Sequence, residues 1–266
     1  MIAAKRRLED PRILRTSELH LPATAEAGRA GSRSRRRRAA TPAPGALALL
    51  GLIALVGCKP FVQGNGVLGE ETRNVAAFEG VSADDGIEVD VTVAAGTAQV
   101  VKLSGDANVV QNIETIVRND AARGIAVLDV KSSVQFDSIH PVTAVISVPT
   151  LRYVRATHAC PVTASQVAVP AFEVDADEDA YVTLSGAGGA TLSVGLQGGQ
   201  RGPATLDARG YPVDTASVAL SGGSTALLAA RVGVSGSATG ASTVKNTGTA
   251  TCTVSASADS KVTCGP

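Results

Sequence analysis

The sequence is poor in large aromatic side chains. Its 266 residues include no Trp, four Phe, three Tyr and a single Met. A core built from this chain must consist mainly of Val, Ile, Leu and Ala, which fill narrow layers and suit β-strands. The composition therefore favours an all-β, repetitive architecture over a globular α/β enzyme.

Long hydrophobic runs are also missing. The apolar run 46–57 has about a dozen residues, whereas a membrane-spanning helix needs roughly 20. It follows the basic block 35–38, and this order is typical of an export signal. Residues 1–57 are therefore predicted to be an N-terminal extension and a signal peptide.

The apolar run ends in Leu55-Val56-Gly57-Cys58, which resembles the lipobox of bacterial lipoproteins. The resemblance implies that the signal is cut before Cys58 and that this cysteine carries the lipid that anchors the protein in a membrane. Because Lys59 follows, and not the Asp of inner-membrane retention, the resemblance further implies the outer membrane. Residues 58–71, which include Gly64 and Gly66, are predicted to be a flexible tether before a domain over 72–266.

Clustered positive charge is lacking beyond the signal. Residues 1–57 hold 11 of the 24 basic and 4 of the 24 acidic residues, which leaves 13 basic and 20 acidic residues and a net charge of about −7. A nucleic-acid surface needs clustered Lys and Arg to displace phosphate counterions. Nucleic acid is therefore not an expected partner.

Cysteine and histidine are few. Three cysteines follow Cys58, and an exported protein can form one disulfide from them. Cys252 and Cys264 are the favoured pair because they flank the short strand-like stretch 254–262. Cys160 is then expected to be a buried free thiol. His158 and Cys160 would share a strand face, but two ligands alone make a weak metal site.

Catalytic motifs are missing as well. The sequence contains no Gly-x-Ser-x-Gly nucleophile elbow, and the glycine-rich run 186–189 lacks the Lys-Ser/Thr of a phosphate loop. The acidic run Asp175, Asp177, Glu178, Asp179 is a weak Ca²⁺ candidate, since alternating carboxylates can chelate this ion. A solvated turn is the favoured interpretation, and no cofactor is predicted.

What the chain does contain is β periodicity. Strict alternation of apolar and polar residues, or bracketing turn residues, predicts strands over 87–93, 99–103, 125–130 and 142–148. Apolar residues at three- and four-residue spacing from Val109 to Val117 predict one short helix, capped by Asp106.

The second half repeats an apolar-Ser-Gly step, at 184–186, 220–222 and 234–236. Each step follows a strand-like stretch, as it would in a β-solenoid whose rungs turn at small residues. The spacings are unequal, so a β-sandwich or barrel made of the same strands stays open as the alternative.

The order of these elements resembles a known family. The segment 73–81, the alternating strand 86–93, the Gly105-Asp106-Ala107-Asn108 turn with its helix, and the strand after Gly124 are similar to the putative auto-transporter adhesin head GIN domain. The resemblance spans about residues 72–250. It implies an exported bacterial protein with a right-handed parallel β-helix-like fold and brings no catalytic residues. Glu88 stands where the family name leads us to expect Asn.

Three functions remain compatible with the sequence. The first is a lipid-anchored cell-envelope protein that binds a glycan or a surface protein without enzymatic activity, through a sheet face rich in Thr, Ser and Asp. The second is a polysaccharide lyase or hydrolase, which would need carboxylates and a base such as Arg152 or Arg155 in one groove. The third is a structural scaffold of the envelope.

Overall fold

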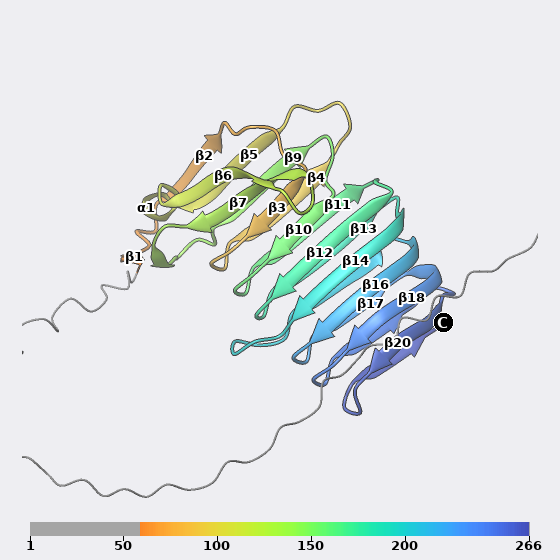
Figure 1. The fold of residues 1–266 in the computed structure, drawn as a ribbon. Helices are drawn as coiled ribbons and strands as arrows, with labels where there is room; N and C mark the ends of the chain where they lie inside the picture. The colour runs from red at the N-terminus through yellow and green to blue at the C-terminus, as the bar shows by residue number, and fades with distance from the viewer. Residues whose placement is uncertain (1–58, 266) are drawn as a thin grey trace, which may run out of the picture. The chain divides into compact units, whose positions relative to one another are not determined.

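The computed structural model describes residues 59–265, so the predictions for residues 1–58, including the signal peptide and the lipidation of Cys58, lie outside it. Within the described residues the strands form three sheets (Figure 1). In spatial order the nine-stranded sheet contains β20 (Thr251–Ala256), β18 (Ala230–Ala238), β16 (Val213–Ser221), β14 (Gly189–Gln197), β12 (Ala171–Asp177), β10 (Tyr153–Ala156), β3 (Gly80–Ala83), β7 (Ile125–Ser132) and β6 (Ile113–Asp120).

The second large sheet has ten strands. The ten-stranded sheet contains β2 (Leu68–Arg73), β5 (Val100–Asp106), β9 (Thr143–Val148), β4 (Glu88–Val93), β11 (Pro161–Val167), β13 (Tyr181–Gly186), β15 (Thr205–Gly210), β17 (Thr225–Leu228), β19 (Thr243–Asn246) and β21 (Lys261–Cys264). A two-stranded sheet pairs β1 (Phe61–Gln63) with β8 (Gln135–Asp137). No helix in residues 59–265 has the length and apolar character needed to cross a membrane.

From β10 onward the chain alternates between the two large sheets, with one strand in each per rung. Neighbouring strands in this part are parallel, and equivalent residues are 20 residues apart at Tyr153 and Glu173 and 18 apart at Thr225 and Thr243. This pairing is that of a β-helix-like solenoid and not of an antiparallel sandwich. The prediction of an all-β solenoid is confirmed.

The core lies between the two large sheets and is built from thin columns of aliphatic side chains. One column on the nine-stranded sheet runs through Val154, Val174, Val194 and Val218, which occupy paired positions on successive strands and are buried. Parallel strands stack equivalent residues in this way, so each rung adds the same small apolar layer as the one before it. This arrangement explains how the chain forms a core with so few aromatic residues.

Antiparallel strands close the first end of the solenoid. β5 pairs antiparallel with β2 and β9, and β6 pairs antiparallel with β7. The short helix α1 (Ala107–Val110) connects β5 to β6, and it buries Val109 and Val110 against the core. These elements cover the edge that parallel rungs would otherwise leave open.

The predicted helix is wrong beyond its first turn. α1 ends at Val110, and Ile113 to Val117, which were expected to continue it, belong to strand β6. The side chain of Asp106 makes no capping hydrogen bond; it accepts hydrogen bonds from the Ile139 amide and the Ser138 hydroxyl instead. Pairing with β7 outweighs the helical spacing because β-branched residues favour strands.

The expected flexible tether over 58–71 is also not what the structure shows. β1 and β2 lie in this segment, and the ammonium of Lys59 bonds Asp85 and the Ser132 carbonyl oxygen. Its glycines permit close approach: a Cβ on Gly64 would overlap the carboxylate of Asp106. Gly64 is therefore needed for the close approach of two parts of the chain and does not make the segment flexible.

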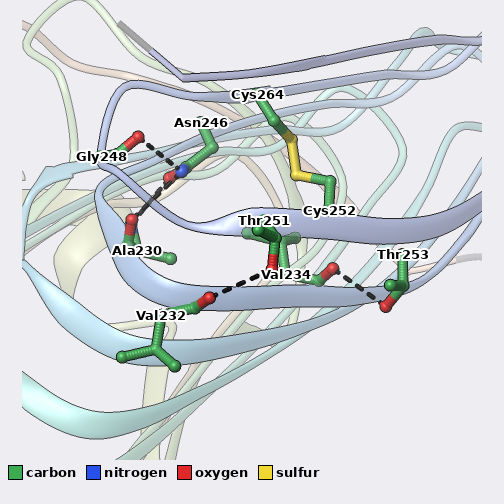
Figure 2. Close-up of a disulfide and its surroundings, with 9 residues drawn as sticks. All are labelled: Ala230, Val232, Val234, Asn246, Gly248, Thr251, Cys252, Thr253 and Cys264. Atoms are coloured by element: carbon green, nitrogen blue, oxygen red, sulfur yellow. Dashed lines mark hydrogen bonds between the residues drawn. A yellow bond between two sulfur atoms is a disulfide. The ribbon is translucent and has the colours of Figure 1, made fainter.

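A disulfide joins Cys252 of β20 to Cys264 of β21, the pair that the sequence favours (Figure 2). The two strands belong to different sheets, so the bridge crosses from one sheet to the other at the last rung. Residues 254–262, expected as one strand-like stretch, hold the end of β20, a turn and the start of β21. Beneath the bridge the buried Asn246 amide bonds the backbone of Ala230 and Gly248.

Candidate functional site

The outer face of the nine-stranded sheet carries charged, amide and hydroxyl side chains. The register aligns Arg155, Asp175, Gly195, Ala219 and Ser237 on successive strands. In this row the residues on β10 and β12 are charged, those on β14 and β16 are small, and the one on β18 carries a hydroxyl group. Because strand residues alternate between faces, the same strands supply the Val column of the core on their other side.

An open depression of about 470 Å³ lies along this face. Its lining includes Arg155, Asp175, Asp177, Gln197, Ser221 and Ser237. The structure thus brings Arg155 and the acidic run together, which their sequence positions alone could not establish. Guanidinium, carboxylate, amide and hydroxyl groups border one surface, and such groups hydrogen-bond polar ligands.

Arg123 organises the charged end of this face. It lies in the turn between β6 and β7, and its guanidinium bonds Asp120 at 2.8 Å, Glu173 at 2.6 Å and Asp175 at 2.7 Å. The guanidinium carbon lies 4.0 Å from the centre of the Tyr153 ring, a cation–π contact. Arg123 therefore ties the first end of the solenoid to the rungs of β10 and β12.

The pKa values around Arg123 shift in opposite directions. The hydrogen bonds that Arg123 donates to the Glu173 and Asp120 carboxylates raise its pKa, although burial opposes them. The side chain of Arg123 lowers the pKa of Asp120. Burial raises the pKa of Asp175, even though the Tyr153 hydroxyl donates to it at 3.0 Å. Burial likewise raises the pKa of Tyr153, which keeps its hydroxyl protonated as a donor.

The acidic run is not the chelating loop that a Ca²⁺ site would need. Asp175 and Asp177 lie on strand β12, where Asp175 bonds Arg123 and Asp177 lies 3.4 Å from Arg155. Glu178 and Asp179 form the next turn, both with positive φ. Arginine side chains pair with Asp175 and Asp177, two of the carboxylates that calcium would require. Residues 59–265 contain no group of three or more His, Cys, Asp or Glu side chains suited to a metal.

His158 and Cys160 do not share a strand face. His158 lies in a turn with φ of 51°, where its ring bonds Asp84 and approaches Glu178 at 3.5 Å. Cys160 points into the core as a free thiol, and burial raises its pKa to about 12. A protonated, buried thiol neither attacks substrates nor binds metals readily.

Sequence reasoning missed Arg123 and Tyr153, and it assigned the buried carboxylate Asp106 to a helix cap. The Nδ1 atom of His140 lies 2.7 Å from Asp106, which is 0% exposed. Burial raises the pKa of Asp106, but hydrogen bonds from His140, the Ile139 amide and Ser138 outweigh it and lower the pKa overall. The one local signal for Arg123 is its spacing of three residues from Asp120.

The comparison with protein families identifies this fold. The model described as "Putative auto-transporter adhesin, head GIN domain" matches residues 77–250. The chain belongs to this family. The resemblance predicted from the sequence is thereby confirmed.

Solved structures share the fold of this head GIN domain at low sequence identity. A putative adhesin from Bacteroides fragilis NCTC 9343 has a TM-score of 0.54 and 16% identity, over 77% of this chain and 97% of that one. A putative adhesin from Parabacteroides merdae ATCC 43184 has a TM-score of 0.50 and 14% identity, over 77% and 100%. No match to a curated protein reaches significance.

Gly86 and Ile87 match the first two residues of the Gly-Ile-Asn that the family name leads us to expect, and both have a structural role in this head GIN domain. Gly86 has φ of 74°, a left-handed conformation that favours glycine, and Ile87 is fully buried. Glu88 begins β4 and is exposed to solvent. The departure from Asn therefore falls at the position where the fold tolerates it.

The head GIN domain should show the opposed pKa shifts in a carboxyl NMR titration. Asp175 is expected to titrate above 3.8 and Asp120 below it. Because the folded state holds the Asp175 proton more tightly than the unfolded state does, this carboxyl lowers stability as the pH rises from 3.8 through its folded pKa. Asp120 acts in the opposite sense, and the stability it contributes is lost as the pH falls from 3.8 through its folded pKa.

The Tyr153→Phe variant is the matched control for this titration. It removes the hydroxyl that lowers the pKa of Asp175, so the Asp175 midpoint should rise further while that of Asp120 stays in place. An Asp175 midpoint at or below 3.8 in the unsubstituted protein would contradict the arrangement.

Proposed function

We propose that this chain is an exported lipoprotein, anchored through Cys58 in the outer membrane of a bacterium, whose head GIN domain binds a glycan or a surface protein without enzymatic activity. The observation that carries the proposal is the open, polar outer face of the nine-stranded sheet. Its depression is bordered by Arg155, Asp175, Asp177 and a row of small hydroxyl residues on successive rungs. Repeated hydrogen-bonding groups suit weak multivalent adhesion.

The relatives support an adhesive role. Two solved structures with this fold are described as putative adhesins. The arginines of the face are engaged in ion pairs, with Arg155 on Asp177 and Arg123 on Glu173 and Asp175. Such pairs hold the side chains in place, so the face is organised before a ligand arrives.

A polysaccharide-acting enzyme is the second candidate. One observation favours it: Arg155, Asp175 and Asp177 come from neighbouring rungs and border one depression. The substitutions Asp175→Asn and Asp177→Asn distinguish an enzyme from a binding domain. An enzyme would lose turnover of polysaccharide, whereas a binding domain would show no turnover before or after the change.

Protease accessibility on intact cells tests the proposal that the head GIN domain is lipid-anchored at the cell surface. We expect the domain to be cleaved on intact cells, because a lipid on Cys58 holds it outside. The Cys58→Ser variant should lose both the lipid adduct in the mass spectrum and the cell-associated cleavage products. Protection of the unsubstituted protein until lysis would contradict surface adhesion and would favour a periplasmic scaffold or enzyme.

Binding by the outer face is tested separately with Arg155→Ala and Gln197→Ala, which remove two polar groups from the depression. Each should weaken retention on a glycan array or on a surface-protein extract. Lys245→Ala, on β19 of the opposite sheet, is the control and should leave retention unchanged.

A further inference from the structure

The most exposed apolar side chains gather near the start of the described chain. Among residues 59–265, five large apolar side chains are more than half exposed, and four of them fall in the segments 61–68 and 135–139. These four, which we call the apolar rim, are Phe61 (62%), Val67 (59%), Leu68 (61%) and Ile139 (65%); the fifth is Val232 (63%), on β18.

The two segments of the apolar rim are neighbours in space. β1 pairs with β8 in parallel, and the Gly64 amide donates to the Asp137 carbonyl oxygen at 2.7 Å. A Cβ placed on Gly66 would lie 3.3 Å from the Cδ1 atom of Ile139. The four side chains of the rim therefore lie on or next to two paired stretches of chain, 61–68 and 135–139.

The rim is held close to the proposed anchor. The Lys59 ammonium lies 2.7 Å from an Asp85 carboxylate oxygen, and the Pro60 carbonyl oxygen accepts from the Gln135 amide at 2.8 Å, so the chain is fixed from the first described residue. Consecutive Cα atoms are about 3.8 Å apart, which limits the distance between the Cα atoms of Cys58 and Phe61 to about 11 Å. A lipid on Cys58 would place the rim at the bilayer surface.

We propose that the apolar rim docks on the membrane in which Cys58 is anchored and so fixes the orientation of the head. The inference rests on the proposed lipidation of Cys58. Its occupant is the interface of the bilayer, where exposed apolar side chains sink about 5–10 Å into the boundary between headgroups and acyl chains. The carboxylates of Asp137 and Glu70 lie in or beside the same segments, so uncharged and zwitterionic lipids suit the rim better than anionic ones.

The absence of Trp from the sequence makes the test direct, because every introduced Trp is a unique fluorescent probe. The lipidated full-length protein is reconstituted into phosphatidylcholine vesicles with brominated acyl chains, carrying Phe61→Trp or Ile139→Trp. Both probes should lose most of their fluorescence and shift to shorter wavelengths. The matched control, Val232→Trp, is equally exposed but lies on β18 and should keep its fluorescence.

Three outcomes separate the hypotheses. If Phe61→Trp and Ile139→Trp are as little quenched as Val232→Trp in protein whose mass spectrum shows the lipid adduct, the docking proposal is overturned while lipidation stands. A missing adduct would overturn the proposed anchoring itself. A concentration-dependent wavelength shift without vesicles, with dimers in light scattering, would assign the rim to a second copy of the chain and overturn membrane docking.

Discussion

Replacing Tyr211 by Ala should lower the free energy of unfolding by about 3–5 kcal/mol, the usual cost of removing a buried aromatic ring. Tyr211 is the largest fully buried side chain among residues 59–265. Its ring centre lies 5.9 Å from that of Phe172, and its hydroxyl donates to the Val169 carbonyl oxygen at 2.8 Å. The aliphatic side chains around Tyr211 are too short to fill the cavity that the loss of its ring would leave.

Tyr211→Phe is the control that separates the ring from the hydroxyl. It keeps the contact with Phe172 and removes the hydrogen bond to Val169, which should cost about 1 kcal/mol. Urea unfolding of the two variants provides the comparison. If the Ala variant were no less stable than the Phe variant, the ring would not be an anchor of the core.

Local alternation predicted the strands of the first half well. The stretch Ile87 to Val93 has one buried and one exposed face, and the structure has strand β4 from Glu88 to Val93. Such a pattern depends on burial of a single face, which neighbouring residues record by themselves. The failure at Val109 to Val117 has the same origin, because spacing records burial but not which backbone conformation produced it.

The rung register could not be predicted. The apolar-Ser-Gly steps suggested equivalent positions, but Leu184 lies on β13 of the ten-stranded sheet, whereas Leu220 and Val234 lie on the other sheet. Residues at paired positions point to the same face of the sheet but can differ in identity, as Glu173 and Ser193 do. Turns of different length also vary the rung period, which hides the repeat in the sequence.

The charged end of the outer face of the nine-stranded sheet was also beyond sequence reasoning. Arg123 and Asp175 are 52 residues apart, and they come into contact because β6 and β7 lie at one end of the nine-stranded sheet that also contains β10 and β12. Sequence composition did anticipate a sheet face rich in Thr, Ser and Asp. It could not show that Arg123 would bond Asp175, one of the carboxylates that had suggested calcium.

The Cys252→Ser, Cys264→Ser double variant should lower the free energy of unfolding by about 3 kcal/mol, the value typical of a bridge that closes a loop of this size. The two cysteines are 12 residues apart and join the strands of the last rung across the two sheets. Within the described chain, this rung has neighbours on one side alone, through β18 and β19. Its inward residues Val254 and Val262 are half-buried.

Native-state hydrogen exchange should show which strands lose stability in the double variant. Amides of β20 and β21 are expected to exchange faster in the double variant, while those of β12 and β14 keep their protection, because rungs stabilise mainly their nearest neighbours. Thr263→Ala, at an exposed position of β21, is the control and should leave exchange unchanged. Equal protection of β20 and β21 with and without the bridge would mean that strand pairing alone holds the rung. Faster exchange would show that the bridge keeps β20 and β21 paired with β18 and β19.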